Sequence, residues 1–124
     1  MEKTFAILGA ALMVLGVGAG AFGAHALESY FEEVPRLEAT YQTAVRYHLI
    51  HGLALFAVAW VAGRWPGNLV NVSGYLIVAG IFLFSGSLYL LSLTDVRWLG
   101  AITPLGGVAF IAGWILLALA VWRG

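Results

Sequence analysis

Residues 41–62 read YQTAVRYHLIHGLALFAVAWVA. The second half of this segment is almost entirely apolar, whereas the first half carries an arginine, two histidines, two tyrosines and a glutamine. A helix needs about 20 predominantly apolar residues to cross a bilayer, so the segment is long enough to span one. Ionisable side chains are costly in hydrocarbon and usually face a protein interior or water. We therefore expect any functional site of this chain to involve residues 41–51.

The composition of the whole chain indicates an integral membrane protein. Of its 124 residues, 62% are hydrophobic and 10% are charged, whereas soluble domains carry about 25% charged residues. The absence of cysteine excludes disulfides, iron–sulfur ligation and a thiol nucleophile. The formal net charge is zero, so nothing favours a nucleic-acid partner. We predict a single transmembrane domain over residues 1–124 that lies in the lipid bilayer.

Apolar segments occupy nearly the whole chain, separated by short polar stretches. The first apolar run is too long for a signal peptide, so we expect it to remain a helix. Residues 28–40 are rich in acids and predict a short amphipathic segment at the membrane surface, where Pro35 suits a first helical turn. The predicted fold is an all-α up-down bundle of four membrane-spanning helices, at residues 4–27, 41–62, 69–93 and 98–122.

The start of the last helix and the glycines of the first one carry local signals. Thr103 is a candidate N-cap, with Pro104 at the first helical position. At about 100° per residue, several glycines of the first segment share a face, where a neighbouring helix can approach closely. We expect this face to pack against residues 41–62, and a contact between protomers is the alternative. The packing glycines are Gly9, Gly16, Gly20 and Gly23.

Four spans place both termini on one side of the membrane. Lys and Arg residues near the helix ends favour the cytoplasmic side. We expect a multi-pass protein of the inner (plasma) membrane with both termini in the cytoplasm, although the balance is narrow. The terminal side carries Lys3, Arg64 and Arg123, and the opposite side carries Arg36, Arg97 and, where it reaches the interface, Arg46.

Polar side chains gather in the leaflet opposite the termini. They come from the end of the first helix, the first half of the second, the last half of the third and the start of the fourth. This asymmetry suggests a polar pocket that is open, or nearly open, to that side. The candidate pocket residues are His25, Glu28, Tyr41, Arg46, Tyr47, His48, His51, Ser85, Ser87, Tyr89 and Thr103.

The rotation of a helix separates some of these side chains. His48 and His51 are three residues apart and therefore neighbours on one face, together with Tyr41. Arg46 points roughly the opposite way, so we expect it to reach the surface or to pair with Glu28 or Glu38.

Several chemistries are open to three histidines in such a pocket. Neutral imidazole is the commonest metal ligand, so His25, His48 and His51 are candidate ligands. The chain lacks a fourth ligand at a diagnostic spacing, and hydrogen bonding between helices is the simpler interpretation. Haem with axial histidines conflicts with close helix packing, and proton or solute transfer conflicts with the apolar terminal-side half. No catalytic triad or carboxylate pair stands out, so we expect neither an enzyme nor a cofactor.

Three sets of residues resemble the domain-of-unknown-function 423 (DUF423) family. They are GAFGAHAL at 20–27, YQTAVRYHLIH at 41–51, and FSGSLY at 84–89 with TPLGG at 103–107. The resemblance covers essentially the whole chain and extends, more distantly, to a small eukaryotic transmembrane protein family. It implies a small four-helix bacterial inner-membrane protein, and it implies no established activity and no agreed catalytic residues.

From the residues and the resemblance we expect a non-enzymatic structural or accessory membrane component. It would act through helix contacts, either with copies of itself in a homo-oligomer or within a larger membrane complex. The alternative is a small-molecule or metal-binding membrane protein, or a small transporter, that uses the polar cluster. Imidazoles that converge on one point would favour binding, whereas imidazoles that each bond a separate carbonyl or hydroxyl would favour the structural role.

Overall fold

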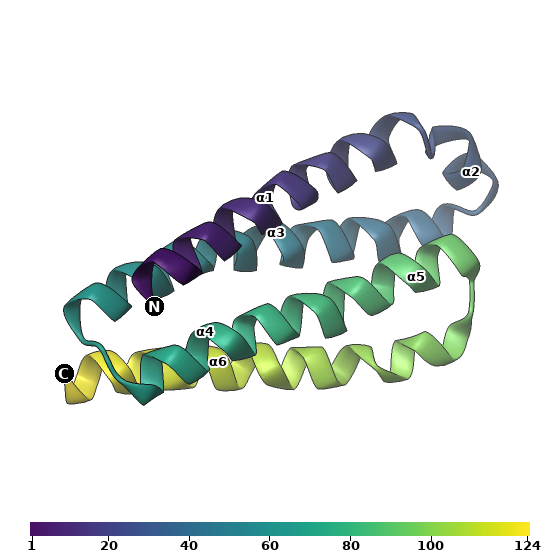
Figure 1. The fold of residues 1–124 in the computed structure, drawn as a ribbon. Coiled ribbons are helices and arrows are strands. Elements are labelled where there is room, and N and C mark those ends of the chain that lie inside the picture. The colour runs from purple at the N-terminus through teal and green to yellow at the C-terminus, as the bar shows by residue number, and fades with distance from the viewer.

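The computed structural model describes residues 1–124 and consists of long antiparallel helices (Figure 1). Four helical spans are long and apolar enough to cross a membrane, which confirms the predicted all-α bundle. The third span contains a π-helical segment, and the fourth begins with a 3₁₀ turn. The elements are α1 (Glu2–His25), α2 (Glu28–Glu33), α3 (Pro35–Arg64), α4 (Asn68–Gly80), η1 (Ile81–Ser85), α5 (Gly86–Thr94), η2 (Arg97–Ala101) and α6 (Thr103–Arg123).

Two predicted helix starts are wrong. The second span begins at Pro35 rather than at residue 41, because the proline occupies the first turn and Leu37 is buried beside Phe31 of α2. The predicted cap at Thr103 is also wrong, since Ile102 is the N-cap residue and no side chain caps this helix. The 3₁₀ turn η2 leads almost directly into α6, and the Thr103 hydroxyl instead bonds the Ser87 hydroxyl at 2.6 Å.

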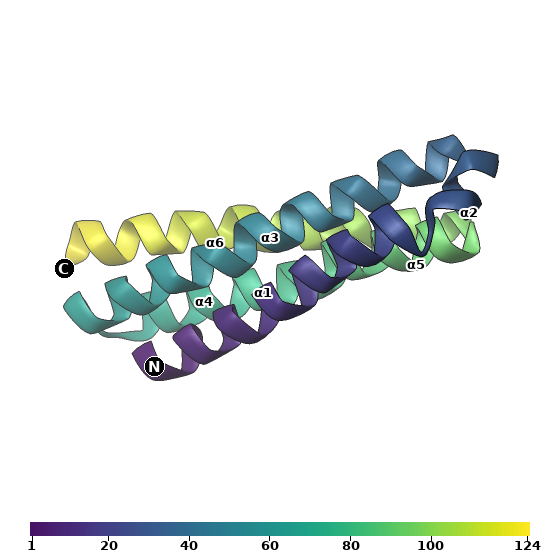
Figure 2. The ribbon, with the colours of Figure 1, turned by 90° about the horizontal axis from the view of Figure 1, so that it is seen from above.

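The helices form two packed pairs. In one pair α1 lies along α3, and in the other α6 lies along α4 and η1; α3 also contacts α4, η1 and α5. Helices α1 and α6 lie on opposite sides of the bundle (Figures 1 and 2). Both chain termini lie at one end, and α2 closes the other end (Figure 1). We refer to these as the terminal end and the α2 end.

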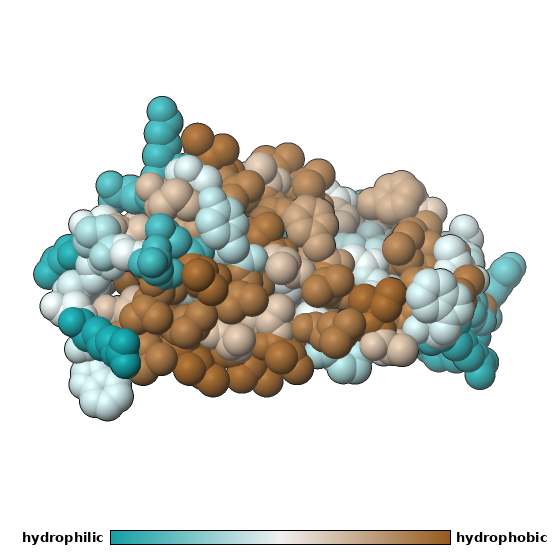
Figure 3. All heavy atoms as spheres, turned by 60° about the horizontal axis from the view of Figure 1, so that its bottom comes forward, coloured by the Kyte–Doolittle hydropathy of each residue, from teal (hydrophilic) through white to brown (hydrophobic).

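The surface suits a lipid environment. Hydrophobic atoms form a broad band between hydrophilic ends (Figure 3). Large apolar side chains such as Val14, Phe82 and Ile111 are exposed on the helices. Soluble monomers rarely expose contiguous apolar patches larger than a few hundred Å². Exposure of apolar surface is unfavourable in water but not in the hydrocarbon of a bilayer, so the band marks the membrane-embedded part of the bundle.

Glycines allow both helix pairs to pack closely. Gly9, Gly16 and Gly23 of α1 are buried against α3, and a Cβ built on Gly16 would lie 2.7 Å from Leu49 Cδ2. Gly20 lies on the same face, 3.5 Å from Val45 by the same measure. The stripe therefore lies inside the bundle.

A second glycine contact joins α6 to the third span. A Cβ on Gly106 would collide with the backbone of Phe84, and one on Gly113 would lie 3.2 Å from the Ser73 carbonyl oxygen. Ser73 Oγ in turn donates a hydrogen bond of 2.8 Å to the Gly113 carbonyl. Sequence analysis did not identify this contact.

Candidate functional site

His48 links three helices near the middle of the bundle. Its Nε2–H donates to the Leu12 carbonyl of α1 at 2.8 Å, and the Tyr89 hydroxyl of α5 donates to its Nδ1 at 2.8 Å. The carbonyl accepts only, so it requires a proton on Nε2. Both ring nitrogens are therefore occupied by the protein.

Two further hydroxyls join the helices around His48. The Tyr41 hydroxyl donates to the Ala19 carbonyl of α1 at 2.5 Å, and its ring lies edge-on to that of Tyr89. Ser85 Oγ of η1 donates to the Ala44 carbonyl of α3 at 2.8 Å. These bonds satisfy side-chain hydroxyls that are expensive to leave unpaired in hydrocarbon.

His51 belongs to a separate network on the α6 side. Its Nδ1–H donates to the Tyr47 carbonyl at 2.9 Å, and the Trp114 indole N–H donates to its Nε2 at 3.1 Å. An indole N–H is a donor only, so Nε2 must accept and the imidazole is neutral. The ring stacks on Phe110, with centroids 3.6 Å apart and planes at 12°. Both nitrogens and one face of this histidine are thus in use.

Ser87, Ser92 and Thr103 form further hydrogen bonds around α5. Ser87 Oγ lies 2.6 Å from Thr103 Oγ1 and 2.9 Å from the Phe84 carbonyl, which ties α5 to the start of α6. Ser92 donates to the Tyr89 carbonyl, while Tyr30 of α2 donates to the Ser92 carbonyl at 2.8 Å. No buried side-chain nitrogen or oxygen lacks a hydrogen-bond partner.

The structure does not bring the three histidines to one point. His25 is exposed at the end of α1, and His48 and His51 lie in the separate networks described above. No group of three or more His, Asp or Glu side chains is placed to hold a metal ion. The two buried imidazoles each bond their own partners, as the structural interpretation expects, whereas the exposed His25 makes no hydrogen bond with the protein.

Glu28 and Arg46 lie outside both networks. Both are exposed, and Arg46 makes no ion pair. At the α2 end, Arg36 instead forms an ion pair with Asp95, through two guanidinium–carboxylate bonds of 3.0 and 2.5 Å. Hydrogen bonding from Arg36, together with the positive charges of Arg36 and Arg97, lowers the pKa of Asp95 below its ordinary value. Sequence analysis missed this pair because its partners are 59 residues apart.

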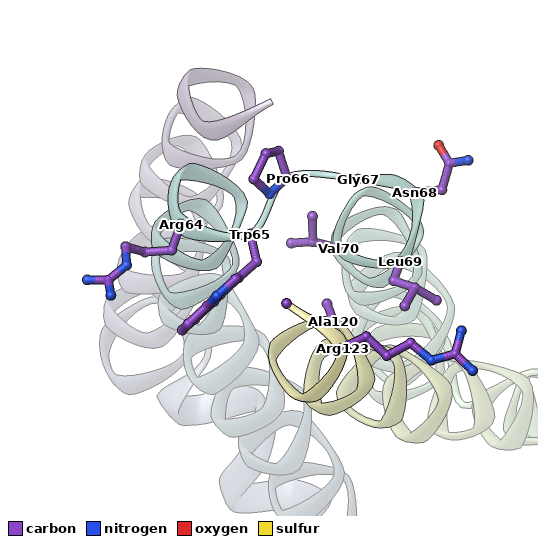
Figure 4. A pocket seen from close by; sticks show the side chains of 10 residues that line it. Arg64, Trp65, Pro66, Gly67, Asn68, Leu69, Val70, Ala120 and Arg123 are labelled. Carbon is purple, nitrogen blue, oxygen red and sulfur yellow. The ribbon is translucent and has the colours of Figure 1, made fainter.

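A hollow of about 390 Å³ at the terminal end has a different character (Figure 4). Arg64 and Arg123 border it, but their guanidinium groups point outward in opposite directions (Figure 4). The Arg64 guanidinium lies over Trp60 and Trp65, 5.3 and 5.4 Å from their ring centroids. Tryptophan and arginine together are typical of a membrane–water interface. The hollow is therefore an interfacial feature and brings no convergent polar groups together.

Two grooves of the bundle wall open sideways. They have volumes of about 400 and 390 Å³ and lie beside the two histidine networks. The first runs between α1 and α5 over Tyr41 and Tyr89; the second lies between α3, η1 and α6, over His51. Their linings are Val14, Leu15, Gly18, Ala19, Phe22, Tyr41, Tyr89 and Leu93 for the first, and Tyr47, His51, Phe84, Gly107, Phe110, Ile111 and Trp114 for the second.

Comparison with known proteins identifies the family. A family model described as "Protein of unknown function (DUF423)" matches residues 19–107. The UPF0382 membrane protein YwdK of Bacillus subtilis (strain 168) is 51% identical over 119 residues, which cover 95% of each chain. A UPF0382 membrane protein of Staphylococcus haemolyticus is 45% identical over 121 residues, covering 98% of this chain and 97% of the relative. No solved structure matches the chain. This protein therefore belongs to the DUF423 family of membrane proteins, whose function is unknown.

Proposed function

We propose that this protein is a non-enzymatic structural or accessory component of the membrane, built as one transmembrane domain. The observation that carries the proposal is that its buried polar side chains are all hydrogen-bonded within the bundle. Most of these bonds reach a backbone carbonyl, and several of them cross between helices. A catalytic or metal site needs groups free to meet a ligand, and the two buried histidines have no free nitrogen.

Elemental and optical analysis tests this proposal. The protein is purified in mild detergent beside a variant with both His48→Ala and His51→Ala. We expect neither stoichiometric metal nor a haem band in the unchanged protein, and a lower unfolding temperature for the variant. A metal or haem signal that is stoichiometric in the unchanged protein and lost in the variant would overturn the structural role.

We further propose that the protein lies in the inner (plasma) membrane with both termini in the cytoplasm. Support comes from the positive charges of Lys3, Arg64 and Arg123, none of which makes an ion pair, whereas of Arg36 and Arg97 at the α2 end Arg36 is paired with Asp95. Because the chain has no cysteine, single cysteines introduced at the exposed positions Ser29 and Asn68 report the α2 end and the terminal end separately. In intact cells a membrane-impermeant maleimide should label the Ser29→Cys variant and spare Asn68→Cys, and the reverse pattern would refute the orientation.

The proposed role implies contacts beyond the bundle, with a second copy of this chain or with a larger complex. Exposed apolar faces on α1 and α6 are available for such contacts. The size of the protein is measured in lipid nanodiscs and again after crosslinking in native membranes. The first measurement tests for a second copy of the chain, and the second also tests for a larger complex. A monomer in both preparations would contradict the proposal.

A further inference from the structure

The groove between α3, η1 and α6 is lined mainly by aromatic rings. Its lining includes Tyr47, Phe84, Phe110 and Trp114 beside the His51 imidazole, and Gly107, which has no side chain. Tyr47 lies 4.4 Å from Phe84 by ring centroids, and the rings of Tyr47, Phe110 and His51 are nearly parallel to one another. Its volume of about 390 Å³ falls within the range of about 300–1,000 Å³ that is usual for ligand pockets.

The groove lies at hydrocarbon depth. Helix α3 has 30 residues and is about 45 Å long, against a bilayer core of about 30 Å. Tyr47 lies about 18 Å along this helix from Pro35, so a centred core places it about 10 Å inside the hydrocarbon. Tyr47 and Trp114 are 37% and 41% exposed, so the groove opens towards lipid rather than into the bundle.

One polar group of the groove has no partner. The His51 nitrogens and the Trp114 N–H are all used, but the Tyr47 hydroxyl makes no hydrogen bond with the protein. An exposed hydroxyl in a soluble protein would bond water. In the hydrocarbon of a bilayer an unpaired hydroxyl costs free energy, and a ligand with an acceptor removes that cost.

The π-helical segment shapes this groove. A π turn adds one residue to the helix, and such turns occur frequently at functional sites. Here η1 contains both Phe84, which lines the groove, and Ser85, which donates to α3 on another side of the segment. Gly106 holds α6 tightly against the Phe84 backbone. The position of Phe84 in the groove lining is therefore fixed by the contact of η1 with α3 and by its contact with α6.

We propose that this groove binds a lipid-soluble molecule that has a flat ring bearing a carbonyl acceptor and a hydrocarbon tail, the chemistry of a prenylated quinone. Aromatic faces favour a planar ring by stacking, and the Tyr47 hydroxyl supplies a donor to its carbonyl. The tail would lie in the surrounding lipid. A plain acyl chain gains nothing from the parallel rings or from the hydroxyl, so it explains the lining less well. This inference goes beyond the structural role proposed above.

The chain offers variants that isolate each element of the site. A Cβ on Gly107 meets nothing closer than Phe84 Cδ2 at 4.0 Å, so Gly107→Leu fills the groove without displacing the backbone. Gly86 has no atom within 4 Å of such a Cβ and does not line this groove, so Gly86→Leu is the matched control. Tyr47→Phe removes the hydroxyl and keeps the ring.

The test is titration of decylubiquinone into nanodiscs that contain the protein, followed by quenching of tryptophan fluorescence. Site binding gives saturable quenching, whereas collision in the bilayer gives quenching that rises steadily with quinone content. We expect saturation in the unchanged protein and in Gly86→Leu, and none in Gly107→Leu. Loss of one hydrogen bond should make the apparent affinity of Tyr47→Phe about three- to tenfold weaker.

Each contrary result overturns the proposal. Steady quenching that is equal in all variants would show no site. An unchanged quinone affinity in Tyr47→Phe would contradict the hydrogen bond assigned to the Tyr47 hydroxyl. This comparison does not depend on whether Gly107→Leu folds. Equal saturation by a phospholipid with brominated acyl chains would assign the groove to ordinary lipid. Dissociation of a dimer in Gly107→Leu alone would assign it to a second copy of the chain.

Discussion

The Tyr89 hydroxyl of α5 donates to His48 Nδ1 of α3 over 2.8 Å, and the opposite nitrogen of the same ring bonds α1. A single imidazole thus joins three of the spans. Removal of the Tyr89 hydroxyl would leave His48 Nδ1 as a buried acceptor without a partner. An unpaired acceptor is costly where no water is present.

Tyr89→Phe is therefore expected to destabilise the bundle. Hydrogen bonds between membrane helices are worth about 0.5–2 kcal/mol, and the loss should fall in that range. Unfolding by SDS in mixed micelles, followed by circular dichroism, measures it. Tyr75→Phe is the matched control, because the Tyr75 hydroxyl makes no hydrogen bond with the protein and the Phe5 contact of its ring is retained. Equal stability of the two variants would contradict the role of His48 as a link.

Gly106 and Gly107 are adjacent in the sequence but differ in what surrounds them. An added methyl group on Gly106 collides with the Phe84 backbone, which has no room to move away, whereas Gly107 has space. Gly106→Ala should cost about 1–3 kcal/mol or more through overpacking. Gly107→Ala should be neutral or slightly stabilising, because alanine favours a helix by up to about 1 kcal/mol over glycine. The same unfolding assay distinguishes them, and similar values for both would refute the close contact of α6 with η1.

Gly16 and Gly18 of α1 provide a comparable pair. A Cβ on Gly16 lies 2.7 Å from Leu49 and 3.3 Å from His48, while one on Gly18 meets nothing within 4 Å. Gly16→Leu should unfold the monomer in detergent, and Gly18→Leu should leave it folded. Size-exclusion chromatography with circular dichroism separates these outcomes. If Gly16→Leu remained a folded monomer and only dissociated oligomers, the stripe would lie at a subunit interface instead.

The spans and the glycine face of α1 were predictable, because length, hydropathy and a rotation of about 100° per residue carry that information. The same rotation placed Arg46 away from the histidines, and it is exposed in the structure. The contact of Gly106 and Gly113 with the third span was not predictable. Lipid and bundle interior are both apolar, so hydropathy does not show which side of α6 faces a neighbour.

The grouping of the candidate site residues was not predictable. Eleven residues were expected in one pocket, yet His48 and His51 belong to networks that face different helices. Grouping depends on the rotation of each helix about its axis. The π-helical segment changes that rotation between Gly80 and Gly86, and no local pattern of residues predicts it.

The pairing of Arg36 with Asp95 predicts a pH dependence at the α2 end. The pKa of Asp95 is below its ordinary value of 3.8, chiefly through hydrogen bonding from Arg36. A carboxylate with a lowered pKa stabilises the folded state above the unfolded pKa, and this is lost as pH falls through the folded pKa. Unfolding measured from about pH 7 to about pH 3 should therefore show a smaller loss of stability in Asp95→Asn than in the unchanged protein.

Asparagine is the suitable replacement because Asp95 has a φ of 56°, a left-handed conformation that asparagine tolerates. Glu38→Gln is the control, since it removes an exposed carboxylate that makes no ion pair. The difference between Asp95→Asn and the unchanged protein should also shrink at about 1 M salt, where exposed charges are screened within about 3 Å. An acid response that is the same in Asp95→Asn and in the unchanged protein would show that the pair does not stabilise this end of the bundle.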